Sequence, residues 1–190
     1  MVEKLAYIII SNLAKYNEYN DIQKEQMNYV LRVLLYEISK FILAIIIFSL
    51  LGYLKESIII LIYMVVTKPF TGGYHEYSQM RCFIATVIII GLVIILSQNS
   101  QLNLITQIVL SSIVVFCVYN QAPIIDRRMP ITKKELIEKN KSIGTINTLV
   151  LAMISVFLFK YNNISNIILW ISIVQTMLLF NNERRWIKWK

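Results

Sequence analysis

Long apolar runs alternate with short polar stretches along the 190-residue chain. A helix of about 20 apolar residues crosses the hydrocarbon core of a bilayer. The pattern therefore predicts an all-α integral membrane protein, a single polytopic domain with about six transmembrane helices. The apolar runs are 33–51, 57–66, 82–96, 102–119, 143–159 and 164–180.

The second run, 57–66, is the shortest of the six. Ten helical residues rise only about 15 Å, whereas the hydrocarbon core is about 30 Å thick. Such a segment must thin the bilayer, be shielded by neighbouring helices, or re-enter on the same side. Pro69 is expected to end this helix, because the residue before a proline avoids the helical conformation.

The N-terminal region, residues 1–32, is predicted to be helical and carries several charged residues. Leu5, Ile9 and Leu13 share one helical face, which favours an amphipathic helix lying in the membrane interface over a signal peptide. Asp21 is the expected N-cap of a long helix whose second half is the first span. Within that span, Glu37 and Lys40 share a face and are expected to pair or to extend towards the interface.

Composition and charge fix the membrane assignment and an orientation. The chain is 57% hydrophobic and 16% charged, with a net charge of +8, whereas soluble proteins are about half apolar and a quarter charged.

With six spans, sixteen basic residues fall on one side and only Lys55 and Lys160 on the other. The positive-inside rule then places both termini on the cytoplasmic side, where Trp186 and Trp189 anchor the tail. A re-entrant second segment gives a poorer split. The charge therefore points to the lipid bilayer as partner, and not to nucleic acid. The basic-rich segments are 1–32, 67–82, 120–142 and 181–190.

The polar insert 67–82 carries the candidate chemistry, because it holds the single histidine, His75, and Cys82 seven residues on. Imidazole exchanges protons near neutral pH, and a thiol becomes a nucleophile beside a base, a cation or a helix N-terminus. On one continuous helix the two would lie about 10.5 Å apart along the axis, against the 3 to 4 Å or so that proton transfer needs. A dyad therefore requires the chain to fold back, which Gly72 and Gly73 permit. The residues alone leave a catalytic dyad and a chance pair both open.

Other polar positions have simpler interpretations. Cys117 lies in an apolar run and is interpreted as a buried apolar residue, not as the disulfide partner of Cys82. Polar residues inside the spans are predicted to make hydrogen bonds between helices. They are Gln107, Asn147, Thr148, Gln175 and Thr176.

The insert KPFTGGYHEYSQMRC resembles the signature of the accessory gene regulator B (AgrB) family, the membrane cysteine endopeptidases of Gram-positive quorum sensing. That family places a basic residue, two glycines, a histidine and a cysteine in this order. The resemblance covers the whole chain: its length, its six apolar segments and a later loop, QAPIIDRRMP, with an AP step and a basic cluster. The chain departs from the family at its basic residue, which is lysine where arginine is typical, and lysine cannot form a bidentate fork. The matching residues are Lys68, Gly72, Gly73, His75 and Cys82.

The resemblance implies an activity. His75 would take the proton of Cys82, whose thiolate would cut an AgrD-like propeptide and form an acyl-enzyme thioester. A cysteine or serine of the peptide would then close a thiolactone or lactone ring, provided that water is excluded. No cofactor or metal is implied. The location would be the cell membrane of a Gram-positive bacterium with the catalytic loop cytoplasmic, and a homodimer is left open.

Several supporting roles stay open at this point. Lys68, Gly72, Gly73 and Ser78 are expected to bind substrate or support the site. The residue that orients His75 is open among Glu37, Glu76, Ser78 and Asp126, or there is none.

A peptide exporter and a membrane scaffold are the alternative functions; a metalloprotease and a P-loop transporter are disfavoured because their motifs are lacking. Basic residues of the 120–142 loop would attract an acidic peptide tail, although the positive-inside rule also explains them: Arg127, Arg128, Lys133 and Lys134.

Overall fold

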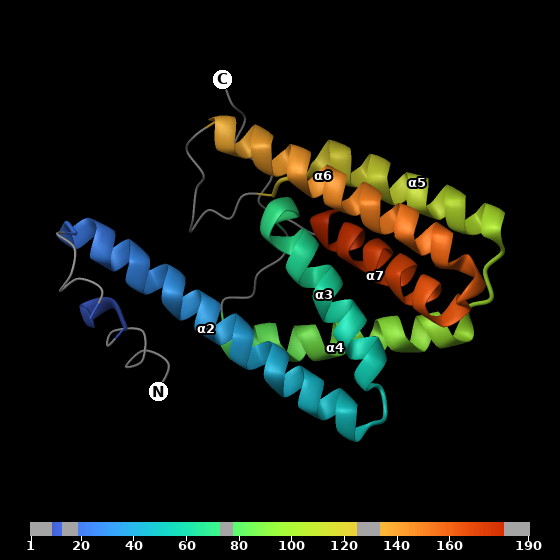
Figure 1. The fold of residues 1–190 in the computed structure, drawn as a ribbon, viewed down its shortest axis with the longest axis horizontal. Helices are drawn as coiled ribbons and strands as arrows, with labels where there is room; N and C mark the ends of the chain where they lie inside the picture. The colour runs from blue at the N-terminus through green and yellow to red at the C-terminus, as the bar shows by residue number, and fades with distance from the viewer. Residues whose placement is uncertain (1–8, 13–18, 73–77, 125–133, 181–190) are drawn as a thin grey trace. The chain divides into compact units, whose positions relative to one another are not determined.

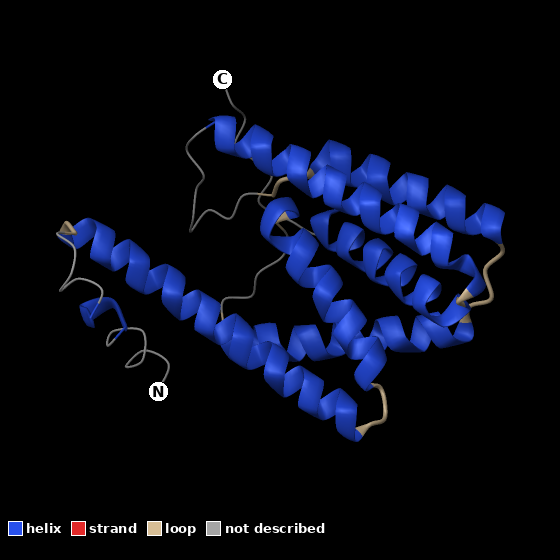
Figure 2. Cartoon of the chain, in the orientation of Figure 1, coloured by secondary structure: helices blue, strands red, loops and turns tan. Residues whose placement is uncertain are grey.

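The computed structural model describes residues 9–12, 19–72, 78–124 and 134–180. These ranges are helical almost throughout (Figure 2), and their β-structure is limited to one isolated bridge between Gly72 and Ile124. Five of the described helices are long and apolar enough to cross a membrane. The prediction of an all-α integral membrane protein is therefore confirmed. Contacts divide the chain after Leu51 into two units, which are described separately below, and the single polytopic domain stays a prediction.

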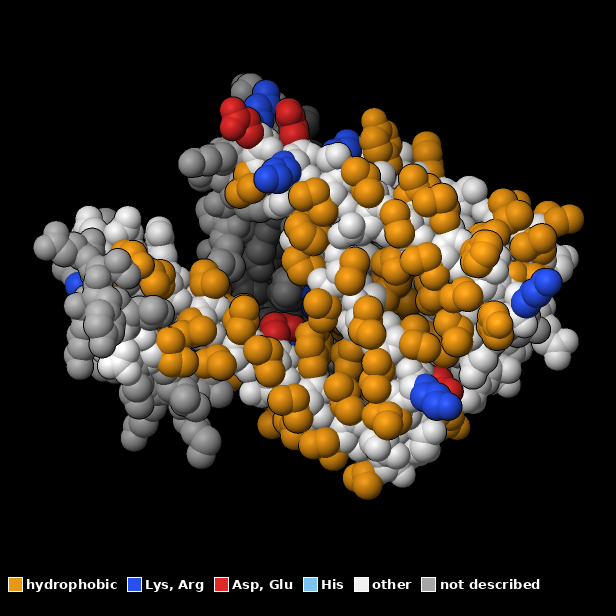
Figure 3. Space-filling view, viewed as in Figure 1, with side chains coloured by type: hydrophobic (Ala, Val, Ile, Leu, Met, Phe, Trp, Pro, Cys, Tyr) orange, Lys and Arg blue, Asp and Glu red, His pale blue; other side chains and the backbone are white. Residues whose placement is uncertain are grey.

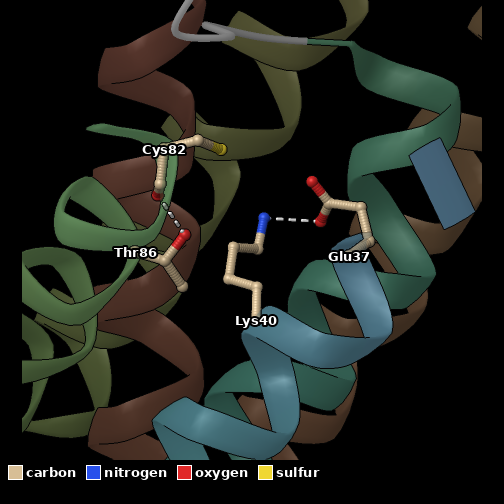
Figure 4. Close-up of polar contacts among 4 residues, drawn as sticks. All are labelled: Glu37, Lys40, Cys82 and Thr86. Carbon is tan, nitrogen blue, oxygen red and sulfur yellow. Dashed lines mark hydrogen bonds and ion pairs between the residues drawn. The ribbon is translucent and has the colours of Figure 1, made fainter. Parts of the chain in front are cut away.

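The first unit consists mainly of helix α2, Asp21–Leu50. Asn20, not Asp21, is its N-cap: Asn20 has an extended backbone, and its N–H donates to Gln23 Oε1 at 3.1 Å in a capping box. The expected N-cap was wrong by one residue. Lys40 Nζ donates to Glu37 Oε2 at 2.5 Å (Figure 4), which confirms the predicted pairing. Residues 9–12 are helical, and the rest of the predicted N-terminal amphipathic helix lies outside the described residues.

The second unit is a bundle of five helices around α7 (Figure 1). Helix α7 packs against each of the other four, and half of its membrane-spanning window is buried, compared with 22% to 28% for α4, α5 and α6. A short 3₁₀ turn, Leu158–Lys160, joins α6 to α7. The helices are α3 (Leu54–Thr71), α4 (Gln79–Asn99), α5 (Leu104–Gln121), α6 (Lys134–Phe157) and α7 (Asn162–Phe180).

A polar cluster ties α5, α6 and α7 together. Gln107 Nε2 donates to Ser155 Oγ at 2.8 Å and to Ser165 Oγ, while each serine hydroxyl donates to the other serine's carbonyl, at 3.0 and 2.8 Å. Gln107 has no exposed surface. We call these three residues the Gln107 cluster. The predicted helix-to-helix role of Gln107 is confirmed.

Helix α3 continues through Pro69 to Thr71, so the expectation that Pro69 ends it was wrong. A proline removes one helical hydrogen bond, and membrane helices tolerate this where neighbouring groups satisfy the backbone. The carbonyl that Pro69 leaves without its helical donor is that of Val65, and the next carbonyl, Val66 O, accepts from Asn147 Nδ2 of α6 at 2.9 Å. Eighteen residues rise about 27 Å, so α3 is longer than the ten-residue run that predicted it. Its passage across the membrane stays a prediction.

The exterior of the five-helix unit is apolar. Figure 3 shows hydrophobic side chains spread over the face in view, with few charged groups among them. Phe157 is 88% and Ile105 73% exposed. Such a surface is unfavourable in water and favourable against lipid tails, because burying apolar area contributes about 25 cal/mol per Å². The surface thus agrees with a position in the bilayer.

Candidate active site

The five-helix unit has a partly open cavity of about 310 Å³, close to the lower end of the range for ligand pockets, roughly 300 to 1,000 Å³. Three of its helices, α3, α4 and α7, supply most of the wall, and α5 and α6 add one residue each. Cys82 lines this cavity, and so do Lys68 and Gly72. The fold thus brings together three of the five residues of the sequence motif. We call it the Cys82 cavity.

Cys82 lies in the first turn of α4. Ser78 is the N-cap, with an extended backbone, and the Cys82 N–H donates to the Ser78 carbonyl at 2.9 Å. One turn further, Thr86 Oγ1 donates to the Cys82 carbonyl at 2.9 Å, and the sulfur points away from that bond (Figure 4). The first turn of a helix carries partial positive charge, which favours an anion such as a thiolate. Cys82 therefore lies at the start of a helix, as the apolar run 82–96 predicted.

Gly72 ends α3 in a conformation that requires glycine. Its φ of 70° and ψ of −153° lie in a region that is essentially closed to other residues. Ile124 N–H donates to Thr71 O at 3.0 Å, and a Cβ on Gly72 would lie 2.2 Å from the Ile124 carbonyl oxygen. The contact joins the insert to the AP step, because Ile124 follows Ala122 and Pro123. We call it the Gly72–Ile124 clasp.

The polar part of the cavity wall is made mostly of threonines. Each hydroxyl lies within hydrogen-bond distance, 2.8 to 3.1 Å, of the carbonyl four residues earlier on its own helix, and the Thr67 hydroxyl lies also 2.7 Å from Gln175 Oε1. Thr148 and Thr176 were predicted to bond between helices and instead bond within their own. The threonines therefore offer the cavity methyl groups and acceptor oxygens. They are Thr67, Thr71, Thr86, Thr148 and Thr176.

The other predicted site residues divide into two groups. Ser78 is exposed at the start of α4, and Lys134 is exposed at the start of α6, away from the cavity lining. Glu37, in the first unit, is paired with Lys40. Within the described ranges, no group of three His, Cys, Asp or Glu side chains is placed to hold a metal ion. The remaining predicted residues lie outside the described ranges: Gly73, His75, Glu76, Asp126, Arg127, Arg128 and Lys133.

Sequence reasoning did not place Thr67 and Gln175 at this site. Gln175 was interpreted as a residue that bonds between helices, and its contact with Thr67 confirms that part, because Gln175 Oε1 lies 2.7 Å from Thr67 Oγ1. Both residues also line the cavity. A signal was available in α3, where Thr67, Lys68 and Thr71 form a polar strip after the apolar stretch 58–66.

These features define a multi-pass helical membrane protein with a cysteine at the start of one membrane helix, facing an internal cavity. The model of the family Accessory gene regulator B matches residues 2–179, and the chain belongs to that family. AgrB-like protein 1 of Clostridium perfringens (strain 13 / Type A) is 46% identical over 161 residues, 85% of this chain and 86% of that protein. Protein FsrB of Enterococcus faecalis (strain ATCC 47077 / OG1RF) is 24% identical over 175 residues, 90% of this chain and 71% of that protein. No solved structure matches the chain. Family membership supports a part in the maturation of quorum-sensing peptides.

Proposed function

We propose that this protein is a membrane cysteine endopeptidase that cleaves an AgrD-like propeptide. The observation that carries the proposal is the shared cavity of Lys68, Gly72 and Cys82. A nucleophile needs a concave site in which a substrate carbonyl can approach it, and the cavity supplies one directly at the cysteine. Family membership supports the same reaction class.

The first step transfers an acyl group to the cysteine. His75 takes the thiol proton of Cys82, and the thiolate sulfur attacks the scissile carbonyl carbon of the propeptide. As the C–N bond breaks, His75 returns the proton to the leaving amine, and the carbonyl is left as a thioester on Cys82. The C-terminal tail of the propeptide departs with the new amine.

The second step releases the peptide as a ring. A cysteine thiol or serine hydroxyl of the bound peptide attacks the thioester carbonyl, a new thioester or ester bond forms, and the Cys82 thiolate leaves. The proton given up by the attacking group returns to the Cys82–His75 pair. Water would end the reaction as a linear acid, so exclusion of water favours the ring. The apolar wall residues, such as Ile89 and Leu179, support that exclusion.

The basic residues have a matching role in this scheme. An acidic propeptide tail on the cytoplasmic side would be attracted by Lys134 and by Arg127, Arg128 and Lys133 of the same loop, and such attraction raises the association rate more than the final affinity. The scheme places both termini and the catalytic loop on the cytoplasmic side. It leaves the protein active as a monomer or a homodimer.

Cleavage in cells tests the proposal. The protein is co-expressed with an AgrD-like propeptide, and the peptide products are measured by mass spectrometry for the native chain and for Cys82→Ala, Cys82→Ser and His75→Ala. Because the nucleophile and its base act as one unit, each variant is expected to lose at least about a thousandfold in cleavage rate. Cys117→Ala is the matched control, since Cys117 is the other cysteine of the chain, and it should cleave normally. Unchanged cleavage by Cys82→Ala would reject the peptidase and favour an exporter or a scaffold.

A further inference from the structure

Gln175 of α7 lies in the wall of the Cys82 cavity. It contacts Thr67 of α3, although the two residues are 108 positions apart in the sequence. Its carboxamide is held at one end by Thr67, whose hydroxyl oxygen lies 2.7 Å from Gln175 Oε1 and 2.8 Å from the Tyr63 carbonyl. Thr67 itself is buried. The side chain of Gln175 is therefore fixed from one side by a residue that has little freedom to move.

A count of the hydroxyl and carboxamide protons shows that Gln175 has an N–H group without an acceptor. A hydroxyl has one proton, so Thr67 donates either to Tyr63 O or to Gln175 Oε1. If it donates to Gln175, both N–H groups of the carboxamide are left for another acceptor. If it donates to Tyr63, the carboxamide must turn round and give one N–H to Thr67, which leaves its second N–H and its oxygen. In both cases at least one N–H of Gln175 has no acceptor among the described residues.

Few other lining residues offer the cavity a hydrogen-bond donor. Thr71, Thr86, Thr148 and Thr176 donate their hydroxyl protons within their own helices, and apart from the charged Lys68 and the Cys82 thiol the lining is otherwise largely apolar. A ligand carbonyl that enters such a cavity loses its hydrogen bonds to water, which is unfavourable if no donor replaces them. The Gln175 N–H is a neutral donor in position to replace one of them.

We infer that Gln175 is a substrate-binding residue whose N–H donates to a backbone carbonyl of the propeptide segment bound in the Cys82 cavity. The inference rests on the proposed function for the identity of the substrate. A peptide fits this wall because its carbonyls need donors while its apolar side chains match the isoleucines and leucines beside them. Thr67 acts as a positioning residue, since it fixes the carboxamide without contacting the peptide through a donated proton.

The first test measures binding without cleavage. Full-length Cys82→Ala protein in phospholipid nanodiscs is titrated with a fluorescein-labelled synthetic AgrD-like propeptide, and the Kd is compared after adding Gln175→Met. Methionine keeps the length of the side chain and removes the donor. Loss of one hydrogen bond of about 0.5 to 1.5 kcal/mol corresponds to a Kd about two- to tenfold higher. Met177→Ala is the control, because Met177 is on the same helix, is exposed and does not line the cavity.

The second test uses kinetics. In the otherwise native protein, Gln175→Met should raise KM by the same factor and leave kcat near native, as expected when an interaction is equal in ground and transition states. Thr67→Val should raise KM by a smaller factor, and Thr67→Ser, which keeps the hydroxyl, should restore it. Equal KM values for Gln175→Met and Met177→Ala would overturn the inference.

The third test identifies the bond itself. Propeptides with one backbone amide replaced by an ester carry a weaker carbonyl acceptor at one position. The ester at the contacted position should weaken binding to Cys82→Ala protein and have no further effect in the Gln175→Met background, which is the signature of a direct coupling. Additive losses at every position would overturn the inference. These binding results do not depend on cleavage, so a native protein that binds through Gln175 but does not cleave would reject the peptidase alone.

Discussion

Two glutamines of the same helical bundle show what a polar side chain can do inside a membrane protein. Gln107 is fully buried, and its two N–H groups are taken up by Ser155 and Ser165 on the neighbouring helices. Gln175 is half-buried, has Thr67 as its one described side-chain partner, and faces a cavity of about 310 Å³. The N–H groups of Gln107 join three helices, although its buried Oε1 has no hydrogen-bond partner, whereas Gln175 keeps an N–H group towards the cavity.

The difference separates polar residues that hold helices together from those that are available to a ligand. Both residues are glutamines inside a predicted span, so the sequence pattern predicts the same role for both. The partners of their N–H donors are what distinguish them. A polar group that lines a cavity and keeps an unused donor is a candidate for substrate binding.

Among the changes that test this comparison, the largest expected effect is at Gly72, which lines the Cys82 cavity. Gly72→Ala puts a Cβ about 2.2 Å from the Ile124 carbonyl oxygen in a backbone region that costs about 1 to 3 kcal/mol for other residues. The Gly72–Ile124 clasp must shift, and we expect propeptide cleavage to fall at least tenfold in kcat/KM. The measurement is cleavage of the synthetic propeptide in nanodiscs.

Gly52→Ala is the matched control for that substitution. Gly52 also has a positive φ, 84°, but a Cβ there meets nothing within 4 Å, so only the backbone strain of about 1 to 2 kcal/mol is added. It should lower stability slightly and leave kcat/KM within about twofold of native. A Gly72→Ala protein as active as Gly52→Ala would contradict the role given to the clasp.

A change in the Gln107 cluster should lower the stability of the protein and leave propeptide binding unchanged. Gln107→Leu removes the donor to both serines, and such bonds in membrane proteins contribute about 0.6 to 1.7 kcal/mol. We expect the free energy of unfolding in detergent to fall by about 1 kcal/mol, with KM for the propeptide unchanged within twofold. A KM shift as large as that of Gln175→Met would remove the distinction between the two glutamines.

The smallest expected effect is at the contact of α6 with α3. A Cβ on Gly144 would lie 3.0 Å from Thr71 Cγ2 and 3.4 Å from Phe70 C, so a small adjustment of a methyl group accommodates it. Gly144→Ala should cost about 1 kcal/mol or less in unfolding free energy and lower kcat/KM by no more than about threefold. Thermal unfolding and cleavage measured on the same sample check both parts, and a loss above tenfold would show that Thr71 is held more tightly than its contacts indicate.

The sequence predicted the helices well because the apolar runs set them. The runs 82–96, 102–119, 143–159 and 164–180 correspond to α4, α5, α6 and α7, and hydrophobic length depends on local sequence alone. The ends were less accurate: α3 passes Pro69 and continues to Thr71, close to the carbonyl of Val66, which accepts from Asn147 far along the chain. Helix α6 begins at Lys134, within the stretch taken as a hydrophilic loop.

The site was predictable only in part, for a similar reason. Lys68, Gly72 and Cys82 were found because they are close in sequence and form a motif. The clasp to Ile124 and the contact of Thr67 with Gln175 join residues about 50 and 108 positions apart, and no local pattern records such contacts. The cavity itself results from the packing of five helices, so its lining follows from the fold and not from any one segment.

The most direct test of the central claim is the intact mass of the protein during the reaction. Native and Cys117→Ala proteins are mixed with the synthetic propeptide, quenched in acid within seconds, and analysed whole and after digestion. The account predicts a mass increase equal to the N-terminal part of the propeptide, located on the fragment that contains Cys82 and removed by hydroxylamine, as a thioester requires. Cleavage of the propeptide without any adduct on Cys82, or an adduct on Cys117 that disappears in Cys117→Ala, would contradict it.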